Sequence, residues 1–538
     1  MKDAAIELPR ARRQAPWQNG WQRMGLLAFA LVSFGPLLAL AAQASRSSGW
    51  LSLALPTGRR AGLLAHSAGL AVAVAAGGMA LGMLAATYLW NWRSGTWARA
   101  RWFLLALALV PPYVHAMAWS SAAAAASTAL ESLGLPAIGF QGWLPGWWVQ
   151  MMSLLPIAVA LALIGLESVE PAMIEAARLV HSDMVTFGRV VLPLAAPAIA
   201  AGAGLLFVLS LTDYSVPSLF GVNVYSLEIL AEYSASSQPA RAFGLALPLL
   251  LIAVGAIAAS QAGLRNAAQS STWRRPAWAT APKWPAWFRR LQWAAMIVLG
   301  LQVAVPILSL AAAVGAGAAL ASSVAAARRE IGFSFWVALT AALVCLPMAL
   351  AAAGKLANAK GGGRLWWLWV TAPLGIPAPL IGIGLIAIWN QPLWSGVYGS
   401  AAMPVLAALA RFVPFAAIIL LTQLRRIDPL LVDAARVSQV HPLRTWLQIR
   451  LPMMLPGLLA ATGLVFALSM AELGATLIVA PPGHATLTMR IYNYLHYGAS
   501  DTVAGLCLMM VAAVLAAGGL ALAALAGWSR LLPDAGKG

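Results

Sequence analysis

The chain has 538 residues, of which 61% are hydrophobic and only 9% are charged, and its formal net charge is +18. Soluble globular proteins carry roughly 25% charged residues, so this composition excludes that class and indicates a membrane protein. Only helices and closed barrels satisfy every backbone polar group within lipid. Apolar runs such as LLALALV do not alternate as barrel strands must. The sequence therefore predicts an all-α, polytopic fold.

Apolar stretches of about 20 residues, the length that a helix needs to cross a bilayer, recur along the whole chain. The sequence predicts twelve transmembrane helices, at residues 24–43, 64–89, 102–122, 147–166, 193–212, 242–262, 291–314, 333–353, 365–389, 401–423, 452–471 and 503–526. The first stretch follows a basic segment but does not end in a site of the A-x-A type. We therefore expect a retained helix rather than a cleaved signal peptide.

The basic residues are concentrated in alternate loops. With the N-terminus inside, 26 of the 34 lysines and arginines lie in the segments that face the cytoplasm. Because membrane proteins keep Lys and Arg in their cytoplasmic loops, both termini are predicted to be cytoplasmic. The positive charge is then a topology signal, and no nucleic-acid partner is expected. Arg411 and Arg490 lie near the outer mouth instead, where we expect packing or snorkelling.

The second half of the chain repeats the first at an offset of 258 to 259 residues. LPLAAPAIAAGAGLLFVLSLTD at 192–213 aligns with LPMMLPGLLAATGLVFALSMAE at 451–472, with the prolines in register. Each half holds six predicted spans, an even number, so the two copies have the same orientation in the membrane. The sequence predicts a six-helix repeat at 1–262, a cytoplasmic linker at 263–290 and a second six-helix repeat at 291–538.

A polar segment with helix-start signals lies between the fourth and fifth spans of each half. Pro171 suits the first turn of a helix, because its missing N–H would be unpaired there, and Asp428 before Pro429 is a good N-cap. A second short helix is expected to begin near Ser182-Asp183 and to run into Leu192-Pro193. We therefore predict a short helical hairpin on the cytoplasmic side of each half.

This loop resembles the cytoplasmic loop of the permease subunits of bacterial binding-protein-dependent ABC importers. The shared pattern is an acidic residue, then Ala-Ala, and Leu-Pro 18 or 19 residues after the acid. In that family the loop forms the coupling helix, which docks on the ATP-binding subunit. The residues to which the resemblance assigns this role are Glu175, Ala176, Ala177, Arg178, Asp433, Ala434, Ala435 and Arg436. Where the family usually has Gly, six residues after the acid, this chain has His181 and Gln439.

The resemblance extends over nearly the whole chain and is greatest to fused permeases of the ferric-iron importer branch. SLTDYSVPSLFG at 210–221 and AELGATLIVAPPGHATLTMRIYNYLHYG at 471–498 look most like that branch. The resemblance implies an inner-membrane permease that imports a small substrate from the periplasm by alternating access. It favours ferric iron as that substrate, and thiamine or a phosphonate are the alternatives.

The chain contains no GxxxxGK[ST] phosphate loop. We therefore expect a pore-forming subunit that is not itself an enzyme, with no catalytic residue, cofactor or resident metal. The resemblance implies two protein partners in addition to the lipid bilayer. They are a separate ATP-binding subunit, in two copies, one for each hairpin, and a periplasmic substrate-binding protein.

Two acidic residues, Asp213 and Glu472, lie at the ends of strongly apolar spans, and the repeat superimposes them. Counting about 20 residues from Pro193 at about 1.5 Å each places Asp213 about 30 Å along its helix, near the outer mouth. An acidic residue at membrane depth is costly and usually faces a cavity or a partner. We expect either a carboxylate pair that attracts a cationic or metal cargo along the substrate pathway, or two carboxylates that cap the following segments or lie solvated at the mouth.

Two other classes of membrane protein remain as alternatives. A secondary transporter driven by an ion gradient would carry charges at mid-depth in broken helices, and the middle of the predicted spans is almost free of charge. A membrane-embedded enzyme would need a cluster of His, Asp or Cys within the spans, and the sequence does not show one. Copurification with an ATPase subunit separates the importer from the secondary transporter.

Overall fold

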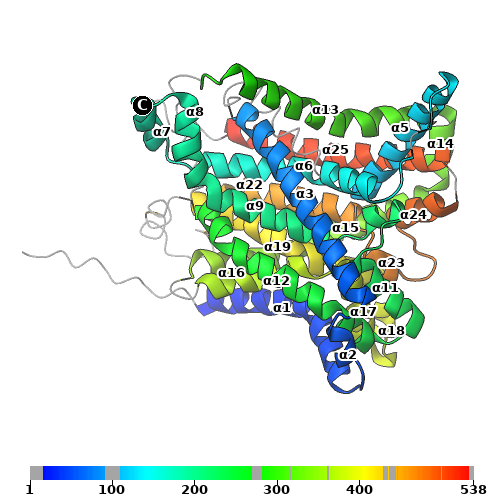
Figure 1. The fold of residues 1–538 in the computed structure, drawn as a ribbon. Helices are drawn as coiled ribbons and strands as arrows, with labels where there is room; N and C mark the ends of the chain where they lie inside the picture. The colour runs from blue at the N-terminus through cyan, green and yellow to red at the C-terminus, as the bar shows by residue number, and fades with distance from the viewer. Residues whose placement is uncertain are drawn as a thin grey trace, which may run out of the picture.

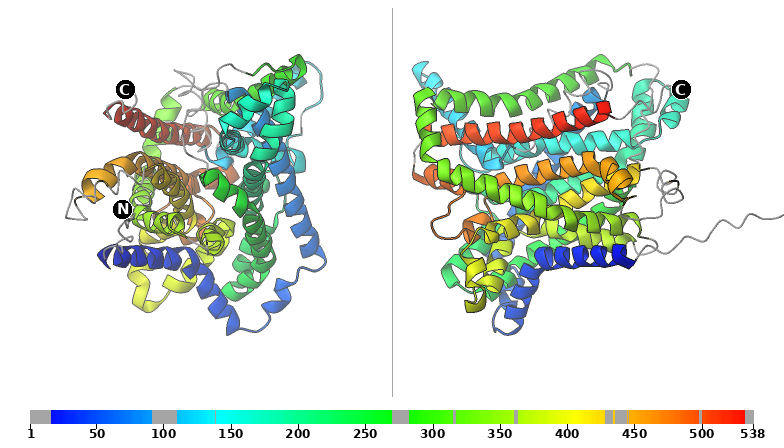
Figure 2. Two further views of the ribbon diagram at one scale, coloured as in Figure 1. Left: turned by 90° about the vertical axis from the view of Figure 1, so that its left-hand side faces the viewer. Right: turned by 180° about the vertical axis from the view of Figure 1, so that it is seen from behind.

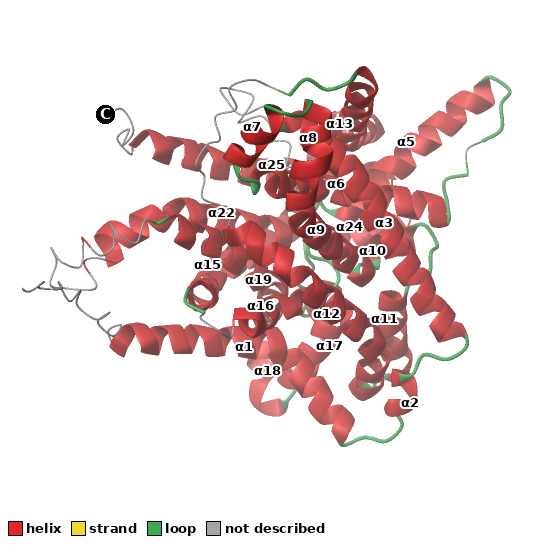
Figure 3. Ribbon diagram, turned by 60° about the vertical axis from the view of Figure 1, so that its left-hand side comes forward, coloured by secondary structure: helices red, strands yellow, loops and turns green. Residues whose placement is uncertain are grey.

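The computed structural model describes residues 16–90, 110–137, 139–269, 282–314, 317–359, 363–427, 434, 444, 446–497 and 500–531. Within these ranges the regular structure is helical (Figure 3). Ten of the helices described are long and apolar enough to cross a membrane, and they coincide with ten of the twelve predicted spans. The prediction of an all-α, multi-pass membrane protein is confirmed.

The described helices form two series, one in each half of the chain. The first half contains α1 (Pro16–Ser45), α2 (Leu51–Ala54), α3 (Arg59–Leu89), α5 (Pro112–Ser132), α6 (Trp143–Glu167), α7 (Pro171–Arg178), α8 (Asp183–Thr186), η2 (Phe187–Val191), α9 (Leu192–Thr212), α10 (Ser215–Leu219), α11 (Tyr225–Ser236) and α12 (Pro239–Gln269). The second half contains α13 (Ala286–Val314), α14 (Gly317–Ala326), α15 (Arg328–Ala357), α16 (Gly363–Thr371), η3 (Ala372–Gly375), α17 (Ala378–Trp389), η4 (Pro392–Trp394), α18 (Ser395–Tyr398), α19 (Ala402–Arg426), η5 (Trp446–Arg450), α22 (Leu451–Met470), α23 (Thr476–Val479), α24 (Leu487–Tyr497) and α25 (Ser500–Leu531).

The short helices lie at the two ends of the bundle. The side that carries α7 and α8 is also where α1 begins and α25 ends (Figures 1 and 2). The short helices α2, α11 and α18 and the helix α24 lie at the opposite end (Figure 1). The end with α7 and α8 is called the hairpin side below, and the other end is called the far side.

The third span of the second half is not a straight helix. Residues 363–389 form two helical pieces, α16 with η3 and then α17, with a bend of 94° between them. Pro377 caps α17 in an extended conformation, and Pro111 caps α5 with the same φ of −58° and ψ of 140°. Because proline disfavours helical geometry at the residue before it, the span predicted at 365–389 is broken at Ile376, whose backbone is extended. The span expected at 102–122 has its described helix only from Pro112 onward, and residues 102–109 lie outside the described part.

A widened helical turn precedes the fifth span of each half. The Leu192 N–H donates to the Phe187 carbonyl, five residues back, so η2 is π-helical. Its counterpart η5 stands at the same place before α22. Pro193 and Pro452 follow directly and cannot donate a backbone hydrogen bond, and a π turn is one way in which a helix accommodates such a break. In the first half, α8, η2 and α9 therefore form one continuous helix, from Asp183 to Thr212.

The first helix of each half packs against the other half. Helix α1 contacts α15, α17 and α19, and the Phe29 ring lies 4.7 Å from the ring of Trp369. The α1 and α17 backbones approach so closely that a Cβ on Gly384 would lie 2.5 Å from the Pro36 carbonyl oxygen. Only glycine permits this approach, so Gly384 allows α1 to pack closely on α17 of the other half.

Helix α13 makes the reciprocal contact with α3, α5 and α6 of the first half. Two buried glutamines fix its position. Gln292 Nε2 donates to Thr87 Oγ1 at 3.0 Å, and Gln302 Nε2 lies 3.3 Å from His115 Nε2. Buried polar groups are costly without a partner, so these two contacts favour one register of α13 on the first half.

Candidate functional site

The predicted hairpin is present in the first half. Helix α7 begins at Pro171 with Glu170 in an extended conformation as its N-cap, and α8 begins at Asp183 after Ser182. Both starting points agree with the sequence prediction. The turn between the helices needs no glycine, because Ser237 is the only non-glycine residue with a positive φ in the described part of the chain. The His181 N–H donates to the Ala177 carbonyl at 2.9 Å, which closes the turn.

The tip of this hairpin exposes apolar side chains. Leu179 is 88% exposed and Val180 is 78% exposed, and Glu175 and Ala176 are exposed on the preceding turns. Ile174 points the other way and is buried. Large apolar side chains that remain exposed next to one another usually mark an interaction surface. The hairpin therefore has one face packed on the bundle and one face available to a partner.

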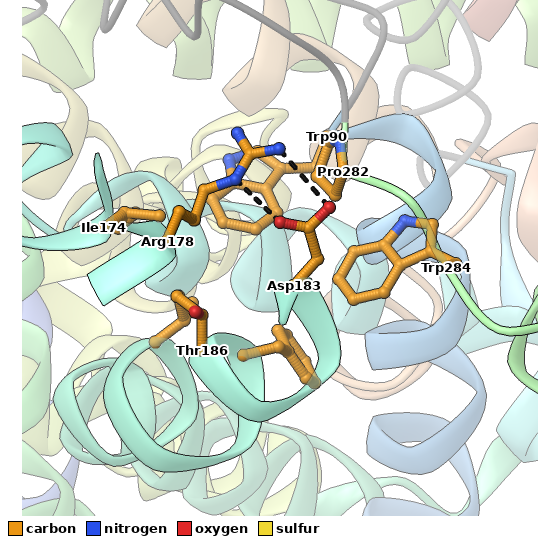
Figure 4. Close-up of a pocket in the computed structure, with 9 residues that line it drawn as sticks. Trp90, Ile174, Arg178, Asp183, Thr186, Pro282 and Trp284 are labelled. Carbon is orange, nitrogen blue, oxygen red and sulfur yellow. Dashed lines mark hydrogen bonds and ion pairs between the residues drawn. The ribbon is translucent and has the colours of Figure 1, made fainter. Parts of the chain in front are cut away.

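Arg178 and Ala177 are less exposed than Glu175 and Ala176. Arg178 Nε donates to Asp183 Oδ1 at 2.7 Å, and Nη2 donates to Oδ2 at 3.3 Å, so the guanidinium ties the end of α7 to the start of α8 (Figure 4). The sequence assigned Arg178 to the coupling set without identifying Asp183 as its partner.

The second hairpin falls mostly outside the described residues. Asp433, Ala435 and Arg436 belong to the undescribed part, and Ala434 is described as helical and exposed. The coupling residues predicted for the second half therefore remain predictions.

Asp213 lies at the junction between α9 and α10. Its Oδ1 accepts from the Ser215 N–H at 3.0 Å and from Ser215 Oγ at 2.7 Å. Its Oδ2 accepts from Gln150 Nε2 of α6 at 3.2 Å. The carboxylate therefore caps the start of α10, which is the second of the two roles considered from the sequence.

Glu472 occupies the equivalent junction between α22 and α23. Its two oxygens accept from the N–H groups of Ala475 at 2.9 Å and Thr476 at 2.8 Å. Arg411 of α19 donates to Oε1 at 2.5 Å, and only 1% of the Glu472 side chain is exposed. Arg411 is thus an ion-pair partner, and the expectation of simple packing or snorkelling is wrong for it. It is wrong for Arg490 as well, which pairs with Glu330 on the far side.

The two junctions meet across the interface of the halves. The Tyr214 hydroxyl donates to the Gly474 carbonyl at 3.4 Å, and the Tyr214 side chain is buried. Within the second half, a Cβ on Gly474 would lie 2.6 Å from the Cβ of Ala378 in α17, so the Glu472 junction is itself closely packed. Asp213 and Glu472 are thus brought close to one contact point between the halves. Their role on a substrate pathway remains a prediction, since their oxygens already have protein donors.

Acidic partners accompany most of the arginines predicted on the outer side. Arg59 pairs with Glu228 at 3.2 Å, and both Arg60 and Arg241 pair with Glu232, at 3.6 and 2.6 Å. These pairs hold α11 against the starts of α3 and α12. They also offset positive charge on the far side, which strengthens the charge difference between the two ends of the bundle.

Residues 78–264 match the family described as the binding-protein-dependent transport system inner membrane component. This region contains the first hairpin and the Asp213 junction. The match relates the chain to the permease subunits of ABC importers and supports a multi-pass membrane protein of that kind.

Individual relatives match over 89 to 191 residues. The chain is 25% identical over 191 residues to the putrescine transport system permease protein PotI of Escherichia coli strain K12, which covers 34% of this chain and 67% of PotI. It is 29% identical over 144 residues to a protein of Salmonella typhimurium named as the 2-aminoethylphosphonate transport system permease PhnV, or 27% of this chain and 54% of PhnV. A match to PhnU of Salmonella typhi is 35% identical over 89 residues, or 16% of this chain and 31% of PhnU. The substrates named for these relatives do not include iron.

Proposed function

We propose that this chain is the transmembrane permease subunit of an ATP-driven importer of the bacterial inner membrane. In this proposal the hairpin side faces the cytoplasm, and both termini lie there. Residues 1–262 and 291–538 form the two six-helix repeats, which the segment 263–290 joins. A separate subunit hydrolyses ATP, and a periplasmic binding protein delivers the substrate.

The observation that carries the proposal is the first hairpin. It stands at one end of the bundle, within the matched region, with Glu175, Leu179 and Val180 exposed on its free face. Such a surface suits a cytoplasmic ATP-binding subunit, and the sequence repeat predicts a second one around Asp433. When two ATP-binding subunits close on ATP, the two hairpins are carried toward each other. The two repeats then rotate and open the path to the periplasm, so that transport depends on two bistable halves rather than on a catalytic residue.

The experiment that tests this proposal reverses charge at the two hairpins. We expect E175K combined with D433K to weaken copurification with the ATP-binding subunit about tenfold or more, because charge reversal at an interface costs several kcal/mol. E131K is the matched control, since Glu131 is also exposed and belongs to α5, outside the hairpins. Normal ATPase association and normal uptake in the E175K/D433K double variant, at normal expression, would contradict the proposal.

A gradient-driven transporter is separated from the importer by the energy source. Proteoliposomes that contain this chain with its ATP-binding subunit and binding protein should take up substrate only when ATP is supplied. An ionophore that collapses proton and sodium gradients should leave that uptake unchanged. Uptake that continues without ATP and stops with the ionophore would favour the secondary transporter.

We propose a small organic molecule with an amino group as the substrate. The support is that putrescine and 2-aminoethylphosphonate, the substrates in the relatives' names, both carry an amine. Ferric iron, the first expectation from the loop resemblance, remains a prediction that the relatives do not support. Calorimetric titration of the cognate binding protein with putrescine, 2-aminoethylphosphonate, thiamine and ferric iron tests the choice, and tight binding of iron alone would reverse it.

A further inference from the structure

The first hairpin contacts a segment of the predicted linker 263–290 that the coupling pattern does not include. Residues 282–285 lead directly into α13, the first helix of the second half, and they pass beside the turn between α7 and α8. Figure 4 shows Pro282 and Trp284 of this segment beside Arg178 and Asp183 of the hairpin. The segment 282–285 is called the α13 leader below.

Asp183 is the residue at which hairpin and leader meet. Its carboxylate accepts two hydrogen bonds from Arg178, on the hairpin itself. Its Oδ2 also accepts from the backbone N–H of Lys283, a residue 100 positions further along the chain. Hydrogen bonds to a charged acceptor are stronger than those between neutral groups. One carboxylate therefore joins α7, α8 and the leader.

Aromatic contacts reinforce the same junction. The Trp284 ring packs edge-on against Phe187 at 5.4 Å and lies 5.0 Å from the ring of Phe288 in α13. Phe187 is the first residue of the π-helical turn that connects α8 to the fifth span. The leader therefore touches the hairpin at the place where its motion would pass into the membrane-spanning helix.

The second half has no counterpart of this arrangement in its sequence. The repeat offset of 258 residues, which aligns Arg178 with Arg436, places His441 where the first half has Asp183. A histidine has no carboxylate with which to receive an arginine and a backbone N–H together. The contacts that join the first hairpin to the α13 leader through Asp183 are called the tie below. The tie is thus specific to the first copy.

We propose that Asp183 is a positioning residue that fastens the first coupling hairpin to α13, so that movement of this hairpin is transmitted to both halves at once. This inference rests on the proposed function, because it assumes that the hairpin is moved by an ATP-binding subunit. Helix α13 packs on α3, α5 and α6 of the first half and on α25 of the second half, so a hairpin tied to its leader moves with helices of both halves. The first ATP-binding site would then control coupling more strongly than the second.

The test removes the Lys283 N–H without touching the hairpin. K283P deletes this donor, whereas K283A keeps the N–H and removes only an exposed side chain. D183N weakens both the ion pair with Arg178 and the hydrogen bond from the Lys283 N–H. The charge swap R178D/D183R restores an ion pair within the hairpin but leaves no acceptor for the Lys283 N–H. It therefore tests the Lys283 hydrogen bond separately from the ion pair.

We expect D183N and K283P to reduce stimulation of the ATPase by the loaded binding protein about tenfold, the size of one charged hydrogen bond. Copurification with the ATP-binding subunit and its unstimulated ATPase rate should stay at the wild-type level. K283A and H441N should behave as wild type, and R178D/D183R should remain defective. Wild-type stimulation in K283P, or full recovery in R178D/D183R, would overturn the proposal.

A second readout does not depend on the proposed function. Hydrogen exchange of the peptide covering residues 171–191, measured on the full chain in detergent, should rise about tenfold in D183N and K283P and stay unchanged in K283A. If the wild-type chain fails to associate with any ATPase while this exchange pattern holds, the tie exists and the importer assignment is wrong. If exchange is the same in all variants, the tie itself is wrong.

Discussion

The Asp213 and Glu472 junctions occupy equivalent positions in the two halves and are held in different ways. Each carboxylate accepts hydrogen bonds from the first backbone N–H groups of the short helix that follows. The fourth long helix of each half then supplies a further donor, which is neutral Gln150 in the first half and cationic Arg411 in the second. In both halves the acidic side chain caps the following short helix, and this cap depends on local backbone geometry. The two halves differ in the charge of the side chain that donates to the acidic residue from the fourth long helix.

Burial explains why the second junction needs a cation. The Glu472 side chain is almost fully buried, and a buried carboxylate is costly unless a charged group is paired with it. Asp213 is partly exposed and can keep its charge with neutral donors. The first junction therefore carries a net negative charge, and the second is close to neutral.

Removing Arg411, the cation at the Glu472 junction, should have the largest effect on stability. We expect R411M to lower the free energy of unfolding by about 3–5 kcal/mol, because it leaves the Glu472 carboxylate buried without its counter-charge. Denaturant titration of the purified chain in detergent measures the loss. The double variant R411Q/E472Q removes both charges and should recover most of it. A loss below about 1 kcal/mol in R411M would show that Glu472 does not depend on the ion pair.

A smaller effect is expected where the two junctions touch. G474A places a Cβ 2.6 Å from the Cβ of Ala378 and 3.4 Å from the Tyr214 ring, so α17 or Tyr214 must shift. Overpacking of this kind costs about 1–3 kcal/mol, measured in the same titration. G396A is the control, since a Cβ there meets no atom within 4 Å. Equal stability of G474A and G396A would indicate that the Glu472 junction is not closely packed against α17.

The smallest effect on stability is expected from replacing Gln150, the neutral donor to Asp213. Q150L removes the hydrogen bonds of Gln150 to Asp213 and to Ser210, and the Asp213 carboxylate keeps its donors from Ser215. We expect a net loss of about 1 kcal/mol, because the buried leucine regains by apolar burial part of what the lost hydrogen bonds contributed. If Q150L proved as damaging as R411M, the difference between the junctions would lie elsewhere than in the buried charge.

Local features of the fold were predictable from the sequence. Pro171 and Ser182-Asp183 mark the helix starts of the hairpin through properties of one or two residues, and the structure begins α7 and α8 there. Ten spans were equally predictable, because a helix of sufficient apolar length is recognisable from composition alone. The break before α17 was missed, although Pro377 is visible in the sequence, because strong hydropathy on both sides suggested a continuous span.

Partners distant along the chain could not be predicted in this way. Arg178 and Asp183 are five residues apart, yet their pairing depends on the turn between two helices, and the Lys283 N–H reaches Asp183 only because α13 packs on the first half. Arg411 is separated from Glu472 by 61 residues. No periodicity within either segment indicates such a contact.

The sequence by itself determined the class of the protein, its repeat and most of its spans, since hydrophobicity and helix-start signals act within about 20 residues. The tertiary structure alone decided what the few buried polar groups do. In the folded chain Glu472 pairs with Arg411, and Asp213 accepts a hydrogen bond from Gln150. The first helix of each half packs on the other half, and the α13 leader contacts the first hairpin. The physical reason is that a buried polar group is stabilised by whichever neighbour packing brings within hydrogen-bond distance, and packing is a property of the whole bundle.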